Sequence, residues 1–276
     1  MDKAGLARLA AEFVRNAPEN VIPPEAAIGP GCGGVRIYGD LLLAFGSADD
    51  PLFEKLKDPG VVSAEHMSPK EWLPQAASVV SWFLPFSDEV KNSNAGGPDP
   101  SPLWLHARIE GEDMNNALRR YMCGVLGGSG AVAPVLDPRW KTVSPFCSNW
   151  SERHAAYICG LGTFGLSKSL ITKKGTAGRF GSVITGCAFE PDEREYEGLT
   201  QWCSMCGACA RSCPAGAIDP SRGPLLGKDH ARCSAYVQKT ARMYGPEGAA
   251  RLRYGCGKCQ TGVPCQNGPA EARPRV

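Results

Sequence analysis

The segment Cys203-Ser-Met-Cys206-Gly-Ala-Cys209-Ala-Arg-Ser-Cys213-Pro214 is the most informative part of this chain. Three cysteines recur at two-residue intervals, and a fourth follows three residues later with proline directly after it. This is the spacing of the bacterial [4Fe-4S] run, in which the fourth cysteine ligates the other cluster. The segment therefore predicts three ligands for one cluster and, through Cys213, one ligand for a second.

Four more cysteines lie downstream, which brings the candidate ligands to two complete sets of four. The alternative is a pair of zinc sites, because C-x2-C pairs also hold zinc. Zinc gives no reason for the unbroken spacing C-x2-C-x2-C-x3-C-P, so two iron-sulfur clusters are the preferred interpretation. The downstream cysteines are Cys233, Cys256, Cys259 and Cys265.

The length of 276 residues leaves room for much more than a cluster-binding module. We expect an α/β domain over residues 1–190 and a two-cluster module over residues 191–276. The polar and charged segment 191–200 is the expected linker between them.

Cysteine usage and charge indicate the environment of the protein. Eight of the 13 cysteines have cluster spacing, and the other five show no paired pattern, which favours a reduced cytoplasm. The first 16 residues lack the apolar core of a signal peptide, and no 18 consecutive residues are apolar, so we expect a soluble cytoplasmic protein without a membrane span. The net charge is +2 and no basic run is concentrated, so nothing supports a nucleic-acid partner. The five remaining cysteines are Cys32, Cys123, Cys147, Cys159 and Cys187.

Hydrophobic periodicity predicts a mixture of helices and strands before the cysteine-rich part. The clearest helix begins at Trp104 and ends at Gly127, and the clearest strand covers residues 77–84. Prolines and asparagines predict a loop over residues 88–103. The other expected elements are helices at 6–14, 50–57, 68–73, 152–159 and 229–244, strands at 41–45 and 132–136, a turn at 28–34 and a loose tail from 268.

A glycine-rich stretch follows, reading Gly160-Leu-Gly-Thr-Phe-Gly-Leu-Ser-Lys-Ser-Leu-Ile-Thr172. It contains G-x-G-x-x-G, but it follows a helix and runs into a strand at 170–172, which is the wrong context for a dinucleotide fold. A simple turn and a loop that cradles a cofactor are both open. The next residues, 173–178, are expected to turn the chain into a strand at 180–185 and so make a hairpin.

Taken in order, Ser151-Glu152-Arg153, Gly160-Leu161-Gly162, Leu170-Ile171 and the eight-cysteine module resemble the catalytic core of the epoxyqueuosine reductases. The cobalamin-dependent reductive dehalogenases share this order. The resemblance covers about residues 70–265. It implies a sheet domain of flavin-reductase or nitroreductase type, followed by a bacterial ferredoxin-like module with two [4Fe-4S] clusters.

The resemblance also implies roles for individual residues. Cys203, Cys206, Cys209 and Cys265 would hold the cluster nearer the corrinoid or substrate, and Cys213, Cys233, Cys256 and Cys259 the other. The cofactor-binding candidates, on the glycine-rich stretch, are Gly162, Gly165, Ser167 and Ser169. The catalytic candidates, just before that stretch, are Cys147, Asn149, Arg153 and His154.

The chain departs from the resembled enzymes in two places that bear on its chemistry. Phe146 aligns with their acidic proton donor, and a phenyl ring cannot donate a proton. The last ligand, Cys265, follows Cys259 at a longer spacing than usual.

The expected function is a cytoplasmic reductase that passes electrons through two [4Fe-4S] clusters to cobalamin, which reduces a small substrate. Its electron donor would be a protein such as a ferredoxin or flavodoxin. The alternative is an electron-transfer or corrinoid-reducing protein with no substrate chemistry of its own.

Overall fold

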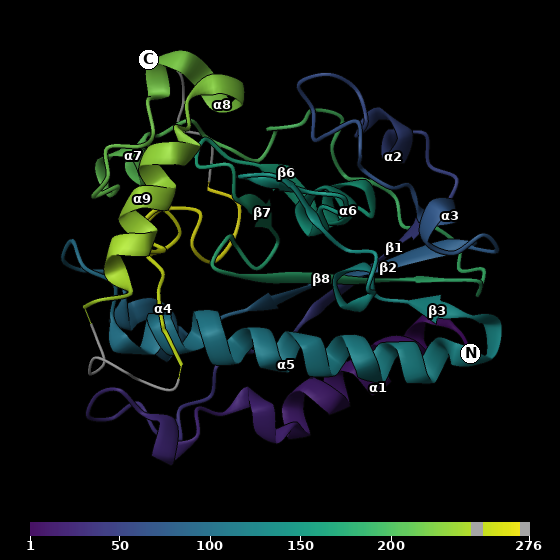
Figure 1. Ribbon diagram of the computed structural model, residues 1–276, viewed down its shortest axis with the longest axis horizontal. Coiled ribbons are helices and arrows are strands. Elements are labelled where there is room, and N and C mark those ends of the chain that lie inside the picture. The colour runs from purple at the N-terminus through teal and green to yellow at the C-terminus, as the bar shows by residue number, and fades with distance from the viewer. Residues whose placement is uncertain (244–250, 271–276) are drawn as a thin grey trace.

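The computed structural model describes residues 1–243 and 251–270, and its centre is a four-stranded antiparallel sheet (Figure 1). The strands lie in the order β1 (Leu42–Ser47), β2 (Ser78–Pro85), β8 (Gly178–Thr185) and β3 (Ala131–Val132). Every residue of β2 is buried, because this strand has a partner on each side and packed side chains on both faces. That burial explains why β2 is so rich in apolar and aromatic residues.

Two helices cover one face of the sheet, α5 (Pro102–Leu126) and α1 (Lys3–Asn16) (Figure 1). Helix α5 begins where the Ser101 hydroxyl accepts the Trp104 N–H at 3.1 Å, and Pro102 fits its first turn because no intrahelical partner is needed there. Met114 and Leu118 of its apolar stripe are fully buried against the sheet.

Shorter elements form the second core on the opposite face (Figure 1). They are α2 (Leu52–Lys55), α3 (Pro69–Trp72), α6 (Glu152–Ile158) and the hairpin of β6 (Gly162–Phe164) with β7 (Leu170–Thr172). Trp72 and Trp150 lie edge to face in this core, with ring centroids 6.4 Å apart. The molecule is therefore layered as helices, sheet and helices.

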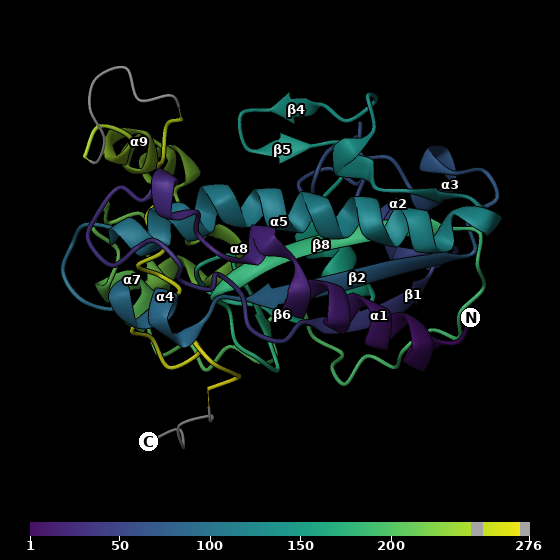
Figure 2. The same ribbon diagram turned by 90° about the horizontal axis from the view of Figure 1, so that it is seen from below.

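The cysteine-rich part lies beside one end of α5, next to α4 (Asp88–Ser93) (Figures 1 and 2). It contains α7 (Ala208–Arg211), α8 (Gly223–Leu226) and α9 (His230–Thr240), followed by a coil that carries the last cysteines. A small hairpin of β4 (Thr142–Ser144) and β5 (Cys147–Ser148) projects from the body in Figure 2. Single 3-10 turns occur at Pro18–Asn20, Pro24–Ala26, Gly127–Ser129, Pro134–Leu136 and Pro220–Arg222.

Most of the expected elements are present, and so is the mixed α/β class. The helices at 6–14, 50–57, 68–73, 104–126 and 152–159 and the strands at 41–45, 77–84 and 170–172 are confirmed within a few residues. Helix α9 confirms the helix expected at 229–244. Residue 244 and most of the expected loose tail from 268 lie outside the described residues. The sheet is entirely antiparallel, and its likeness to nitroreductases stays a prediction.

Three local predictions are wrong. The strand at 180–185 makes no hairpin with 170–172; β8 pairs instead with β2, from Ser78 opposite Thr185 to Pro85 opposite Gly178. Burial of both faces drives this long-range pairing, which no local turn signal reveals. The loop at 88–103 begins with helix α4, whose cap is the Ser87 hydroxyl. The strand at 132–136 stops at Val132, because Pro134 cannot donate a ladder hydrogen bond.

The expected linker over residues 191–200 is anchored to the sheet at its start. The Asp192 carboxylate accepts the Lys3 ammonium at 2.6 Å and the Phe45 N–H at 2.9 Å. Two contacts from distant parts of the chain hold this segment against α1 and β1. The division at residue 190 remains a prediction.

Candidate metal centre and adjoining cavity

The eight cysteines come together from three separate stretches of the chain. Cys209 lies on α7 and Cys233 on α9, and the others lie in coil. Left-handed backbone between ligands lets the coil turn tightly: φ is 53° at Met205 and 69° at Gly207. A left-handed conformation at a residue such as Met205 is uncommon, and local strain of this kind is concentrated at functional sites.

One set consists of Cys203, Cys206, Cys209 and Cys265, which line a small cavity of about 20 Å³. Burial, and then the neighbouring thiolates, raise the pKa of Cys265 to about 12, and Cys203 and Cys206 contribute most after burial. The pKa of Cys209 is raised to about 12 by burial and by thiolates of the same set and Cys259. Three thiols of the 203–213 segment and the most distant cysteine therefore face one another.

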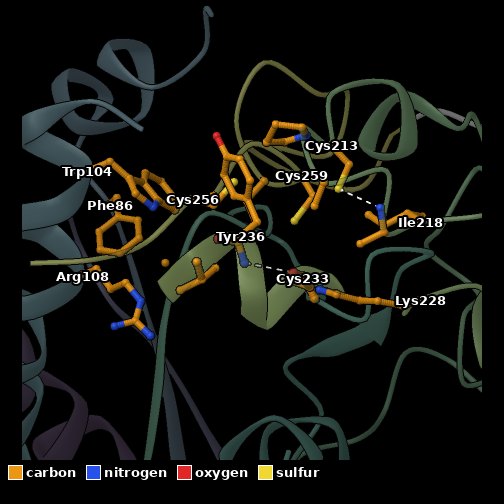
Figure 3. A pocket seen from close by; sticks show the side chains of 18 of the residues that line it. Phe86, Trp104, Arg108, Cys213, Ile218, Lys228, Cys233, Tyr236, Cys256 and Cys259 are labelled. Atoms are coloured by element: carbon orange, nitrogen blue, oxygen red, sulfur yellow. Dashed lines mark hydrogen bonds between the residues drawn. The ribbon is translucent and has the colours of Figure 1, made fainter. Parts of the chain in front are cut away.

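The other set consists of Cys213, Cys233, Cys256 and Cys259, which line a larger cavity (Figure 3). Burial, and then the thiolates of Cys259, Cys213 and Cys233, raise the pKa of Cys256 to about 12. The Ala217 N–H donates to the Cys213 sulfur at 3.3 Å, and such bonds tune the potential of an iron-sulfur cluster. The ligands are thus interleaved along the chain.

These donors fit two four-iron clusters by number and chemistry. Because the raised pKa values keep the free thiols protonated at neutral pH, binding iron would release protons. Within the described residues, no three His, Cys, Asp or Glu side chains are close enough to hold a single metal ion. The assignment rests on the grouping of the thiols around two cavities.

The larger cavity has a volume of about 240 Å³ and extends from the second thiol set toward the sheet domain. Its aromatic lining includes Phe86, Trp104 and Tyr236. Four cationic side chains also line it, namely Arg108, Arg153, Arg179 and Lys228. Among the lining residues that the structure describes, none is Asp or Glu.

Of the four catalytic candidates, Arg153 alone is found among the described lining residues of this cavity. Arg153 is exposed to solvent, and the neighbouring protein atoms partly desolvate it and lower its pKa. Asn149 is occupied elsewhere: its amide donates to the Arg139 carbonyl and accepts the Lys141 N–H, both at 2.9 Å. Asn149 thereby holds the base of the β4–β5 hairpin.

The other two candidates lie near Arg153. The His154 ring is 2.7 Å from the Ser151 hydroxyl, and burial, followed by the Arg153 charge, lowers its pKa to about 3. His154 is therefore neutral at physiological pH. Cys147 is half-buried on β5 and lies near Arg153.

The four cofactor-binding candidates divide between the two cavities. Ser169 lines the larger one, where its hydroxyl accepts a hydrogen bond from Gln260 at 2.9 Å. Gly165 and Ser167 line the smaller one beside the first thiol set. Gly162 lies inside the β6–β7 hairpin, where an added Cβ would overlap the Ile171 carbonyl, so its role there is backbone packing.

Sequence reasoning missed several lining residues. Arg108 lies on α5, Arg179 on β8 and Gln260 directly after Cys259. No motif marks the two arginines, because they reach the cavity only through the packing of α5 and β8. The position of Gln260 beside a cluster ligand was the one available signal.

Phe146 lies at the tip of the β4–β5 hairpin and is half-exposed. Its ring stacks on His230 of α9, with centroids 5.6 Å apart. The hairpin therefore contacts the cysteine-rich part through an apolar ring.

Comparison with known proteins supports a 4Fe-4S region in the cysteine-rich part. A family model described as a 4Fe-4S binding domain matches residues 200–219. A tetrachloroethene reductive dehalogenase of Desulfitobacterium hafniense is 38% identical over 72 residues, which are 26% of this chain and 13% of the dehalogenase. The matched segment is therefore a small part of that relative.

Solved structures match over almost the whole chain. An epoxyqueuosine reductase aligns with a TM-score of 0.51 and 18% identity, covering 98% of this chain and 68% of that one. A catabolic reductive dehalogenase aligns with a TM-score of 0.55 and 15% identity, covering 97% of this chain and 37% of that one. The chain has the fold of these reductases. This fold is mixed α/β with a 4Fe-4S region, as the sequence led us to expect. No helix in residues 1–243 or 251–270 is long and apolar enough to cross a bilayer.

The volume of the larger cavity can be compared with the size of cobalamin. Drug-sized molecules occupy pockets of about 300–1,000 Å³, and a corrinoid is larger than these molecules. The cavity has about 240 Å³, part of which lies between the second set of thiols. A space of this size does not enclose a corrin ring.

Proposed function

We propose that this protein is an iron-sulfur reductase that holds two [4Fe-4S] clusters and reduces a small molecule in the larger cavity. The observation that carries the proposal is the position of the second thiol set, whose four members line that cavity. Clusters of this type supply electrons one at a time at potentials set by their surroundings. A ligand in the cavity would lie beside this source.

The side chains of this protein would shield a ligand in the larger cavity from water and orient it. Phe86 and Trp104 form an apolar side of the cavity, which limits the access of water to the reacting molecule. Gln260 and Ser169 are hydrogen-bonded to each other and add polar atoms to the lining of the same cavity.

Tyr236 is the candidate group for holding a proton near the ligand. Its hydroxyl donates to the Pro98 carbonyl at 3.0 Å, while burial and then the Cys256 thiolate raise its pKa to about 12. The phenol therefore keeps its proton across the physiological range.

The sequence-based resemblance adds cobalamin and an electron donor such as a ferredoxin or flavodoxin to this proposal. The fold shared with a reductive dehalogenase supports the cobalamin part, and the size of the cavity argues against an enclosed corrin. We therefore derive no step through cobalamin.

Anaerobic purification with iron, sulfide and cobalt counted together tests the proposal. We expect about eight irons and eight sulfides per chain, as two [4Fe-4S] clusters require. About four irons, or stoichiometric zinc, would contradict the two-cluster proposal. Cobalt in equal amount to the protein would establish the corrinoid.

An electron-transfer or corrinoid-reducing protein without substrate chemistry is the second candidate. The small volume of the cavity favours it, because a cluster would fill part of that space. Reduced protein that binds no small molecule, yet reduces free cobalamin or a redox protein, would support this candidate over the reductase.

A further inference from the structure

The two thiol sets differ in the charge of the side chains around them. Four cationic side chains line the larger cavity, which lies between the thiols of the second set, and none of its described lining residues is Asp or Glu. The described residues that line the smaller cavity, beside the first set, include no Lys, Arg, Asp or Glu. The two sets therefore offer different electrostatic surroundings to clusters of the same type. The four cations are Arg108, Arg153, Arg179 and Lys228.

Carboxylates of the protein leave most of this positive charge uncompensated. Within residues 1–243 and 251–270, no carboxylate lies within ion-pair distance of Arg108, Arg153 or Lys228. Arg179 approaches Glu112 at 3.7 Å. A four-iron cluster with four thiolate ligands carries a net negative charge, so it would offset these cations, and the cations would in turn act on the cluster.

Lys228 acts on a ligand of the second set. Its ammonium donates to the Ser167 carbonyl at 2.9 Å, which ties the side chain to the turn between β6 and β7. Burial raises the pKa of Cys259, and the charge of Lys228 makes the largest opposing contribution. Figure 3 shows Lys228 and Cys259 among the side chains that line the larger cavity.

Arg153 acts on the same ligand from another element. It lies on α6 and donates to the Lys168 carbonyl at 2.6 Å. Burial lowers the pKa of Arg153, and the Cys259 thiolate opposes that effect. Two cations from separate parts of the chain therefore lie near one sulfur of the second set.

Positive charge near a cluster raises its midpoint potential, because reduction adds a negative charge. The hydrogen bond from the Ala217 N–H to the Cys213 sulfur acts in the same direction. We propose that Lys228 and Arg153 give the cluster of the second set a higher midpoint potential than the cluster of the first set. This inference rests on the proposed two-cluster reductase. It implies that an electron shared between the clusters resides mainly at the larger cavity.

Redox titration of the anaerobic wild-type protein, followed by electron paramagnetic resonance, measures the two midpoint potentials. Cys213→Ala lacks one ligand of the second set and so identifies the signal of the first set. We expect that signal to have the lower potential in the wild-type protein. Equal potentials, or the reverse order, in a protein with about eight irons per chain would overturn the inference.

Lys228→Gln should lower the potential of the cluster of the second set by about 59 mV, which is a tenfold change in the equilibrium of a one-electron couple. An elementary charge about 12 Å from another changes an equilibrium by about this factor at an effective dielectric constant of about 20. Lys228→Arg keeps the charge and should keep the potential. The matched control is Lys239→Gln, because Lys239 is exposed on α9 and is not among the described lining residues.

An equal shift of both clusters in Lys228→Gln, or no shift of either, would reject the role of Lys228. So would the same shift in Lys228→Arg, because the lost charge would then not be its cause. If Lys228→Gln fails to retain its iron, Arg153→Gln, which should lower the same potential, takes its place.

Reduction of small molecules by the reduced protein reports separately on the proposed function. The expected order of potentials without any such reduction would reject the reductase and leave the inference standing. About four irons per chain would reject both.

Discussion

Cys259 is the residue at which the two thiol sets meet. Burial raises its pKa, as do Cys233 and Cys213 of its own set. Its thiolate in turn acts on Cys209 and Cys265 of the first set. The two sets are therefore neighbours, as transfer of electrons between two clusters requires.

Cys213→Ala should remove the cluster of the second set and retain the other. Cys213 faces Cys256 and Cys233, although it is adjacent in sequence to ligands of the first set. Iron should fall from about eight to about four atoms per chain, with one electron paramagnetic resonance signal lost.

Cys187→Ala is the matched control, because Cys187 is half-buried beside the sheet core and belongs to neither set. Loss of the signal that depends on Cys203, with the Cys256 signal intact, would contradict the ligand assignment.

His66 should make the stability of the fold depend on pH. Burial, and then the Lys57 charge, lower its pKa to about 4, and neither ring nitrogen has a hydrogen-bond partner among the described residues. In the unfolded chain His66 binds a proton below about pH 6.5, whereas in the folded chain it does so only below about pH 4. The contribution of neutral His66 to the unfolding free energy is therefore fully present above pH 6.5 and is lost as the pH falls toward 4.

Between pH 7 and pH 5 this difference amounts to about 2 kcal/mol of unfolding free energy. Denaturant unfolding followed by tryptophan fluorescence measures it, and His66→Leu should reduce the pH dependence by that amount. If the unfolding free energy of the wild-type protein and of the variant changes with pH in the same way, His66 has the same pKa in the folded and unfolded chains, and the prediction is wrong.

The buried amide of Asn94, at the end of helix α4, contributes to joining this helix to the coil after α9. The Asn94 side chain donates to the Cys256 carbonyl at 3.0 Å and to the Thr261 hydroxyl at 3.1 Å, and it accepts the Ser101 N–H at 3.0 Å. Asn94 thereby links the start of α5 to the coil that carries three ligands.

Asn94→Ala should lower the unfolding free energy by about 3 kcal/mol, since three buried hydrogen bonds are lost. We expect the cluster of the second set to be released first, which absorbance during denaturation records. Asn92→Ala is the control, because Asn92 is exposed on the same helix. Equal stability of the two variants would show that Asn94 does not hold the coil.

The elements that sequence reasoning placed correctly are those with strong local signals. Helix α5 has a cap, an N-terminal proline and a long apolar stripe. The sequence located strand β8 but predicted the wrong partner strand for it. The true partner, β2, lies about a hundred residues earlier, and no local sequence signal indicates this pairing. The β6–β7 hairpin was missed since its first strand is only three residues long and begins with a glycine.

The two hydrophobic cores on the faces of the sheet contain none of the eight candidate ligands. The cysteine-rich part has few buried apolar side chains of its own, such as Ala217, Ile218 and Val263. Its order therefore depends on the metal far more than the order of the sheet does.

Removal of iron by an anaerobic chelator should loosen the described residues from 203 onward and leave the sheet protected. Hydrogen exchange followed by mass spectrometry measures both parts in one experiment. We expect fast exchange in α7 and α9 and slow exchange in β2 and α5. Simultaneous loss of protection in β2 would show that the clusters stabilise the whole chain.

The sequence alone determined the cluster chemistry, because the spacing of ligands within one short segment is a local property. It also indicated the mixed α/β class, through periodicities that each element carries by itself. Only the tertiary structure decided which thiol set borders the larger cavity and which side chains enter it. Arg108, Arg153 and Arg179 come from α5, α6 and β8, and they line one cavity only because those elements pack around the same end of the sheet.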